Sequence, residues 1–348
     1  MNKYLKISSL LVFTFTALIA EAGNNDRAGQ AGAGELLINP WARSSGWSSA
    51  NVGSVRGLEA VFSNVAGLAF TPKTEVIFSR TAWLSGTDIN INSFGLAQRV
   101  GETGVLGISI MSMSFGSIDI TTVNNPQGGV GSYSPSYSNL AVSYAKEFSH
   151  SIYGGVTIRG ISESITDVSA EGLALDAGIQ YVAGKYDNVK FGISLKNVGP
   201  PLSYSGEGLT DKTTRSGLGN TFTPSVSQKT QSLELPSLFN IGVTYDYKLA
   251  EMHRLTFAGT FTSNAFTYDE FTGGVEYGFR NIFMVRGGYT YRQKDVNNNL
   301  TNAYLGPTAG FTVEIPIGKG GKTFGLDYSY RLTDFFGGTQ SLGAKLSL

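Results

Sequence analysis

The feature that most constrains this sequence is a repeated alternation of apolar and polar residues from about residue 75 to the C-terminus. The segment 323–332 reads TFGLDYSYRL and the segment 237–247 reads SLFNIGVTYDY, so large apolar side chains fall at every second position. A period of two places such side chains on one face of a β-strand. Segments of about ten residues are long enough for a tilted strand to cross hydrocarbon. The pattern therefore predicts membrane-spanning strands with one face towards lipid.

Fourteen segments of this kind follow one another along residues 75–348. They cover residues 75–85, 90–100, 104–115, 138–147, 151–164, 172–183, 189–197, 237–247, 253–262, 269–277, 282–293, 305–315, 323–332 and 341–348. In lipid an open sheet edge would leave backbone groups without partners, so the first and last strands must pair. The sequence predicts an all-β protein, a 14-stranded antiparallel transmembrane β-barrel.

The connections between these segments alternate in length. One set is uniformly short, at 101–103, 148–150, 184–188, 248–252, 278–281 and 316–322, whereas the other set includes the long connections 116–137, 198–236 and 294–304. Short periplasmic turns and longer external loops are typical of bacterial outer-membrane barrels. We therefore expect an outer-membrane protein with both termini in the periplasm. A soluble β-sandwich is the alternative, but it gives no reason for long loops to gather at one end.

Composition narrows the class of protein. Charged residues make up 15% of the chain and cysteine is absent, against about 25% charge in soluble domains. A formal net charge of zero argues against a nucleic-acid partner. After the first 22 residues no apolar stretch is long enough for a membrane helix.

The sequence offers little for catalysis. Its only histidines, His150 and His253, lie beside different predicted short turns. It has no G-x-S-x-G nucleophile elbow and no calcium-binding or phosphate-binding loop. We therefore expect no enzyme activity, no cofactor and no metal site.

The N-terminus has the pattern of a secretory signal. Lys3 and Lys6 precede an apolar run at 10–19, which is followed by Ala-Glu-Ala at 20–22. This pattern predicts a signal peptide over residues 1–22 and a mature chain that starts at Gly23. Residues 23–74 then form an N-terminal segment and plug ahead of the barrel at 75–348.

Residues 31–70 are rich in Ala, Gly and Ser and have no sustained period of two. We interpret them as an internal plug. The dipeptide Ala42-Arg43, the tripeptide Ser45-Gly46-Trp47 and the run Asn64-Val65-Ala66-Gly67-Leu68 resemble the N-terminal hatch of the PorV/PorQ branch of FadL-like outer-membrane barrels. In that family the last run usually reads Asn-Pro-Ala-Gly-Leu. The predicted plug residues are Trp41, Arg43, Trp47, Asn64 and Gly67, and Trp41, Trp47 and Leu58 are expected to pack the plug in the lumen.

The resemblance implies a function that the residues alone do not. PorV proteins are Bacteroidota outer-membrane proteins of the type IX secretion system, which bind the C-terminal signal of cargo proteins and carry them onward. The resemblance thus implies that this chain is a protein-binding accessory or shuttle. Its partners would be outer-membrane lipid and proteins of a secretion or envelope-assembly complex. Residues 55–59 read VRGLE instead of the acidic pattern common in the hatch, which suggests a side branch. Two alternatives remain: an accessory barrel of another complex such as the barrel-assembly machinery, and a FadL-type channel for hydrophobic compounds.

The long connection 198–236 is the expected partner-binding region, because loops beyond about 15 residues are usually functional or disordered. Within it Tyr204, Arg215 and Phe222 are the candidate contact residues.

Period-two phasing also predicts the interior of the barrel. It points eleven charged residues inward: Arg99, Arg159, Asp176, Lys190, Lys196, Asp246, Glu276, Arg286, Glu314, Asp327 and Arg331. The remaining inward positions are expected to be Gly, Ser and Thr, which predicts a polar lumen without the apolar pocket that a hydrophobic ligand needs. Aromatic residues near strand ends, namely Trp83, Tyr181, Phe279, Phe283 and Tyr304, are expected to form girdles at the membrane interfaces.

Overall fold

The structure is a computed structural model that describes residues 23–212, 215–217, 220–222, 224–292, 303–318 and 320–348. The predicted signal peptide at 1–22 and most of the predicted loop 294–304 lie outside the described residues.

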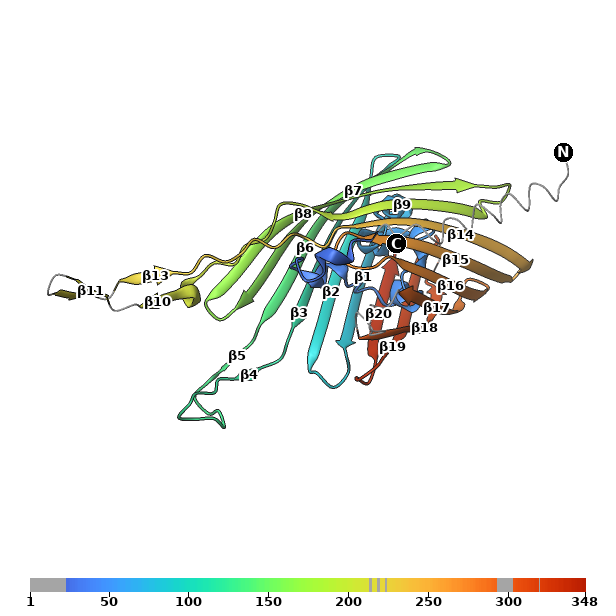
Figure 1. Ribbon diagram of the computed structural model, residues 1–348. Helices are drawn as coiled ribbons and strands as arrows, with labels where there is room; N and C mark the ends of the chain where they lie inside the picture. Colours follow the sequence, from blue (N-terminus) through green and yellow to red (C-terminus); the bar gives the residue numbers. More distant parts are fainter. Residues whose placement is uncertain (1–22, 213–214, 218–219, 223, 293–302, 319) are drawn as a thin grey trace.

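Fourteen antiparallel strands form one closed barrel, which confirms the predicted fold (Figure 1). In order around the barrel they are β1 (Thr74–Trp83), β2 (Ile89–Val100), β3 (Gly104–Ser114), β6 (Ser136–Ser149), β7 (Ile152–Ile165), β8 (Val168–Ala183), β9 (Val189–Val198), β14 (Leu238–Ala250), β15 (His253–Asn264), β16 (Glu270–Phe279), β17 (Phe283–Arg292), β18 (Tyr304–Pro316), β19 (Thr323–Thr333) and β20 (Thr339–Ser347). Pairing of β1 with β20, from Glu75 opposite Ser347 to Ala82 opposite Gln340, closes the ring as predicted. None of the helices among the described residues is long and apolar enough to cross a membrane.

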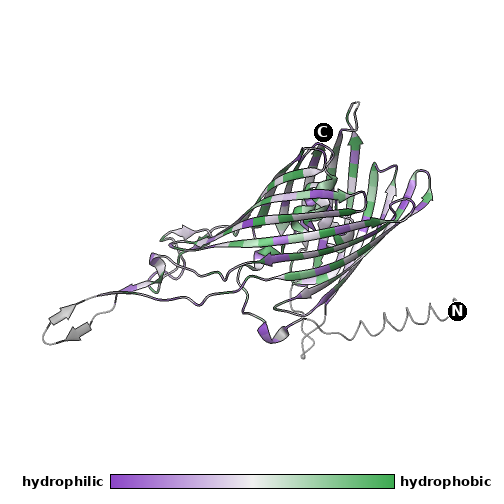
Figure 2. Cartoon of the chain, turned by 90° about the horizontal axis from the view of Figure 1, so that it is seen from above, coloured by the Kyte–Doolittle hydropathy of each residue, from purple (hydrophilic) through white to green (hydrophobic). Residues whose placement is uncertain are grey.

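Alternation along each strand separates the outside of the barrel from its lumen. On β3, Leu106, Ile108 and Ile110 point outward and are about half exposed, whereas Val105 and Met111 are fully buried inside. Figure 2 shows hydrophobic residues along the whole barrel wall. The wall therefore presents an apolar surface to its surroundings on every side.

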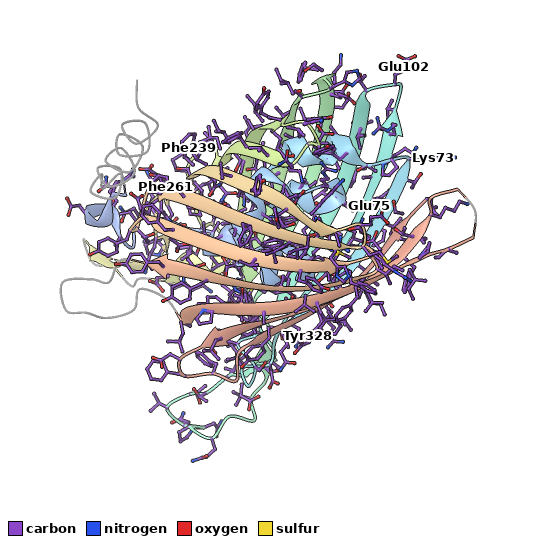
Figure 3. The ribbon with its side chains drawn as sticks, turned by 90° about the vertical axis from the view of Figure 1, so that its right-hand side faces the viewer. Lys73, Glu75, Glu102, Phe239, Phe261 and Tyr328 are labelled. Carbon is purple, nitrogen blue, oxygen red and sulfur yellow. The ribbon has the colours of Figure 1, made fainter. Side chains whose placement is uncertain are left out.

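The two ends of the barrel differ. At one end, called here the short-turn end, the connections between strands are brief; Lys73, Glu75 and Glu102 lie there (Figure 3). At the opposite, long-loop end, two connections contain ribbons that the sequence analysis did not predict. These are β4 (Ile118–Asp119) with β5 (Ser132–Tyr133), β10 (Thr210–Lys212) with β13 (Ser225–Ser227), and β11 (Arg215–Gly217) with β12 (Asn220–Phe222).

Residues 33–70 fold as short helices inside the barrel. They are η2 (Gly34–Leu37), α2 (Ala42–Gly46), η3 (Ala50–Gly53), η4 (Gly57–Phe62) and η5 (Val65–Phe70). Trp41 packs edge-on against Phe62 with ring centroids 5.8 Å apart, Leu58 is fully buried, and Trp47 packs with Ala50 and Ala258. We call residues 33–70 the plug.

The described chain begins and ends at opposite ends of the barrel. The amide of Leu348 donates to the Thr74 carbonyl (2.8 Å) at the short-turn end, whereas the amide of Gly32 donates to the Glu234 carbonyl (2.9 Å) at the long-loop end. A bond from the Asn24 amide to the Asn264 carbonyl (3.4 Å) places the start of the segment there too. The expectation that both termini share one end does not hold for the described residues, because the plug runs lengthwise through the lumen.

Candidate functional site: two cavities beside the plug

The plug leaves two cavities in the lumen. The long-loop cavity, of about 540 Å³, lies between the plug and the wall at the long-loop end. The short-turn cavity, of about 410 Å³, lies on the other side of the plug. Residues of the plug line both, so the plug separates them.

One half of the inner wall carries many apolar side chains. Strands β1–β3 and β6–β8 point Ile77, Ile91, Met111 and other apolar side chains at the plug, where they bury Leu58 and Leu68. The prediction that inward positions hold only small polar and charged residues is therefore wrong for this half. At positions such as these the strands carry apolar residues on both faces, and alternation alone cannot reveal which face meets the plug.

The other half of the wall is charged, and Arg43 joins the plug to it. Arg43 Nε donates to Asp327 Oδ1 (2.9 Å), and a second guanidinium nitrogen, Nη2, donates to Glu314 Oε2 (2.9 Å). Glu59 of the plug lies 3.4 Å from the same guanidinium. Burial raises the pKa of Glu59, although Arg43 opposes that shift. Arg43 thus ties helix α2 to strands β18 and β19, as one cation among three carboxylates.

From there an ionic network continues along the wall, strand by strand, to β9. Its members beyond Arg43 are Lys345 and Glu314, Asp327 and Thr312, Arg286 and Glu276, Arg254 and Asp246, and finally Lys190. Nearly every charge predicted to face inward on these strands has an opposite charge beside it, as burial requires.

A second group of charges holds the end of η4. Arg159 donates to the Val61 carbonyl (3.0 Å) and to Asp176 (2.7 Å), and Lys196 Nζ donates to the Phe62 carbonyl (2.7 Å). The last carbonyls of a helix have no partner within the helix, so cations are stabilising there. Strands β7 and β9 therefore fix the centre of the plug.

Asn64 and Gly67 both lie against backbone groups of neighbouring segments. Asn64 Oδ1 accepts from the Ala66 amide (3.3 Å) at the start of η5, while its Nδ2 donates to the carbonyls of Val52 (3.1 Å) and Ile179 (3.0 Å). A Cβ atom on Gly67 would lie only 2.1 Å from the Val55 carbonyl oxygen and 2.9 Å from the Ala60 methyl. Asn64 thus caps η5 and joins two parts of the plug to β8.

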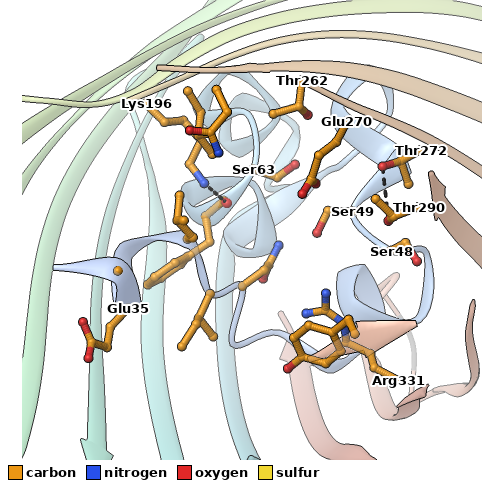
Figure 4. A pocket seen from close by; sticks show the side chains of 18 of the residues that line it. Glu35, Ser48, Ser49, Ser63, Lys196, Thr262, Glu270, Thr272, Thr290 and Arg331 are labelled. Atoms are coloured by element: carbon orange, nitrogen blue, oxygen red, sulfur yellow. Dashed lines mark hydrogen bonds between the residues drawn. The ribbon is translucent and has the colours of Figure 1, made fainter. Parts of the chain in front are cut away.

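The long-loop cavity has two unlike sides (Figure 4). One side carries Trp83, Ile89, Met113 and Phe115, all from the β1–β3 wall or the loop just after it. The opposite side carries hydroxyl groups of Thr262, Thr272 and Thr290, which Figure 4 labels. The amide groups of Asn240 and Asn264, on β14 and β15, also line the cavity. The cavity is therefore amphipathic.

An aromatic and cationic stack borders this cavity. Trp83 packs edge-on against Tyr304 with centroids 5.5 Å apart, and the guanidinium of Arg331 lies 3.9 Å from the centre of the Tyr304 ring. The prediction that Trp83 and Tyr304 belong to an interfacial girdle is therefore wrong, because both point into the lumen. Tyr181, Phe279 and Phe283 do point outward and are exposed.

The three predicted partner-binding residues do not form one group. Tyr204 packs against the buried core and its hydroxyl donates to Glu163. Arg215 and Phe222 lie opposite each other in the β11–β12 ribbon, and their side chains fall outside the described part of the structure. The structure thus pairs Arg215 with Phe222 on neighbouring strands, whereas Tyr204 packs elsewhere, against the buried core.

Neither histidine is among the residues that line the two cavities. His150 is exposed with its Nδ1 3.4 Å from Glu147, and His253 Nδ1 lies 2.6 Å from the Tyr277 hydroxyl. Among the residues that the structure describes, no group of three or more His, Asp or Glu is placed to hold a metal ion.

Comparisons with known proteins agree on the fold. The sequence matches no family model and no curated protein. Among solved structures, the CymD monoaromatic hydrocarbon channel superposes with a TM-score of 0.55 at 12% identity, covering 89% of this chain and 97% of that chain. The Pseudomonas putida toluene transporter TodX superposes with a TM-score of 0.52 at 13% identity, covering 84% of this chain and 94% of that chain. A Pseudomonas aeruginosa FadL homologue superposes with a TM-score of 0.52 at 13% identity, covering 87% of this chain and 98% of that chain. The chain therefore has the fold of a FadL-like barrel.

Proposed function

We propose that this protein is an outer-membrane channel that admits a small hydrophobic compound into the long-loop cavity. The observation that carries the proposal is the cavity itself, about 540 Å³ between plug and wall, with Trp83, Ile89, Met113 and Phe115 on one side. Pockets of about 300–1,000 Å³ with apolar and aromatic linings are typical of small-molecule sites. The solved structures of similar fold that are named as channels or transporters support this choice.

The surface of the barrel supports a place in the outer membrane. Side chains such as Ile158, Ile179 and Leu326 stand exposed on the outside of the wall, and a closed barrel leaves no backbone edge in lipid. With the usual arrangement of short turns in the periplasm, the long-loop cavity opens towards the outside of the cell. The plug then stands between an incoming compound and the periplasm.

Uptake of toluene by cells that produce the protein, against cells that do not, tests this proposal. Ile89→Trp should fill part of the cavity and lower uptake severalfold. Leu106→Trp is the matched control, because Leu106 points outward from the neighbouring strand. Equal uptake with and without the protein would rule the channel out, provided that heat-modifiable migration shows a folded barrel.

A second candidate is the protein-binding accessory or shuttle that the plug motifs suggest. Its specific observation is that the β10–β13 and β11–β12 ribbons of the connection 198–236 extend well away from the barrel (Figure 1). Such ribbons could contact a partner protein of a secretion or envelope-assembly complex. Deleting residues 207–228 would remove them yet keep the buried Leu202 and its bridge to Leu233. Co-purification of the same proteins with the trimmed barrel would rule out this role for the loop.

A further inference from the structure

We infer that the long-loop end of the lumen holds a binding site for one calcium ion, between the carboxylates of Glu35 and Glu163. The site goes beyond the channel function, because it concerns how three elements are joined: the start of the plug, strand β7 and the connection 198–236. Three observations support it: a buried carboxylate oxygen without a partner, a second carboxylate close to it, and tyrosine hydroxyls around both.

Glu163 is the buried carboxylate. It faces the lumen from β7 and is only 9% exposed. Its Oε2 accepts a hydrogen bond from the Tyr204 hydroxyl, whereas its Oε1 has no partner among the described residues. Within that part of the chain it forms no ion pair, and Arg159 on the same strand is already bound to Asp176 (2.7 Å). A buried carboxylate without a counter-charge is costly, so this position favours a bound cation.

Glu35 supplies the second carboxylate, from the plug. It lies in η2 at the edge of the long-loop cavity (Figure 4). Burial raises the pKa of Glu35, and the charge of Glu163 raises it further, so the two carboxyl groups lie close together. Glu35 likewise has no ion pair within the described part of the chain. Two like charges held close together repel each other, and one divalent cation between them would neutralise both.

The groups around the two carboxylates are oxygen donors. Tyr204 contacts Glu163 from the connection 198–236, and Tyr137 lies directly opposite Glu163 in the register of β6 and β7. A phenol is neutral at pH 7 and offers an oxygen lone pair. Calcium binds six to eight oxygen ligands in flexible geometry, whereas magnesium requires a near-ideal octahedron. Two carboxylates, completed by hydroxyls and water, therefore suit calcium.

The composition of the site also sets its expected affinity. Calcium sites are tuned by the number of charged ligands, and those of extracellular modules have dissociation constants of about 10⁻⁴–10⁻³ M. With two carboxylates from separate elements, this site belongs to the weak class. A bound ion would join η2, β7 and the connection 198–236 at one point.

Terbium luminescence of the full-length barrel in phosphatidylcholine nanodiscs tests the inference, because terbium occupies calcium sites and emits when a neighbouring tyrosine is excited. The wild-type protein should give a saturable emission that calcium displaces with a dissociation constant of about 10⁻⁴–10⁻³ M. Glu163→Gln should abolish this emission, and Glu35→Gln should weaken calcium binding severalfold. Glu171→Gln is the matched control, because Glu171 lies on the neighbouring strand β8, opposite Ser162, and points outward.

Thermal unfolding separates a metal ligand from a residue with only a structural role. Calcium should raise the unfolding temperature of the wild type but not that of Glu163→Gln, which keeps an acceptor for the Tyr204 hydroxyl. In EDTA, Glu163→Gln should be at least as stable as the wild type, because the unpaired buried charge is gone.

Three results would overturn the site. The first is a wild-type protein without calcium-displaceable emission, as expected if Glu163 is simply kept as a neutral acid. The second is an unchanged calcium response in both Glu163→Gln and Glu35→Gln. The third is an equal loss of the response in Glu171→Gln, which would show that calcium acts on the surface charge of the barrel in general.

Discussion

Arg43 in the plug and Asp327 in strand β19 are 284 positions apart in the sequence, yet Arg43 Nε donates to Asp327 Oδ1 at 2.9 Å. Both side chains are largely shielded from solvent. With Glu59 and Glu314 on the same guanidinium, Arg43 attaches the plug to the charged half of the wall.

Arg43→Met should therefore loosen the plug. Removing one partner of a buried ion pair typically costs about 3–5 kcal/mol, because the carboxylates stay buried without a counter-charge. We expect faster backbone hydrogen exchange across residues 41–62 and a larger single-channel conductance in planar bilayers. Arg27→Met is the control, since Arg27 pairs with Glu234 in a solvent-exposed position where a pair contributes only about 0–1 kcal/mol. Unchanged exchange in Arg43→Met would contradict the attachment.

Arg99 should stabilise the junction between the plug and strand β1. Its guanidinium donates to the carbonyls of Ala69 (3.0 Å), Thr71 (2.7 Å) and Pro72 (2.9 Å), where the plug meets β1. Arg99→Met removes all of these bonds, so limited proteolysis should cut near residues 69–73 several times faster. Arg99→Lys should restore little, because an ammonium cannot reproduce the fork of guanidinium donors. Equal protection in all three proteins would show that the junction is held by other contacts.

The outward face of β19 should not tolerate charge. Leu326 is 44% exposed on the outside of the wall, and an arginine facing lipid costs about 2–4 kcal/mol at the bilayer midplane. Leu326→Arg should lower the fraction of protein that shows heat-modifiable migration on gels. Val123→Arg is the control, because Val123 is fully exposed in the connection 116–137. Equal folding of both variants would argue that Leu326 does not face lipid.

The start of the plug should be held more tightly in acid than at neutral pH. Burial raises the pKa of Glu35, and the nearby Glu163 adds to the shift. A carboxyl whose pKa is raised in the folded state contributes stability at low pH and loses that contribution as the pH rises through its folded pKa. Hydrogen exchange of residues 33–40, corrected for intrinsic rates, should therefore slow as the pH falls. Glu35→Gln should flatten this dependence, whereas Glu102→Gln in an exposed turn should leave it unchanged.

The strands could be predicted because apolar and polar residues alternate along each of them with a period of two. Each predicted segment overlaps one strand of the barrel, and residues as far apart as Glu75 and Ser347 pair as expected. The inward charges were also predictable, because a charged residue that alternates with large apolar residues can only face the lumen. Arg159, Asp176 and Arg286 are all buried in the lumen with partners.

The character of the cavities could not be predicted in the same way. Val105 and Leu106 are both apolar, so the sequence of β3 does not say which face meets the plug. Trp83 and Tyr304 lie at strand ends, where an aromatic side chain can face either the lipid or the lumen. The contact between Lys196 of β9 and the Phe62 carbonyl of the plug joins segments far apart in the sequence, and no local pattern contains it.

The plug enters the lumen at one end and continues into β1 at the other. A segment held in that way is threaded through a closed ring, since β1 and β20 meet around it. The segment can shift along the barrel axis or rearrange inside the lumen, but it cannot leave the lumen by rotating about one end, because both of its ends are held. During assembly, the ring must close around the threaded segment or the segment must later be drawn through it, so the order of these two events decides whether the barrel is ever empty.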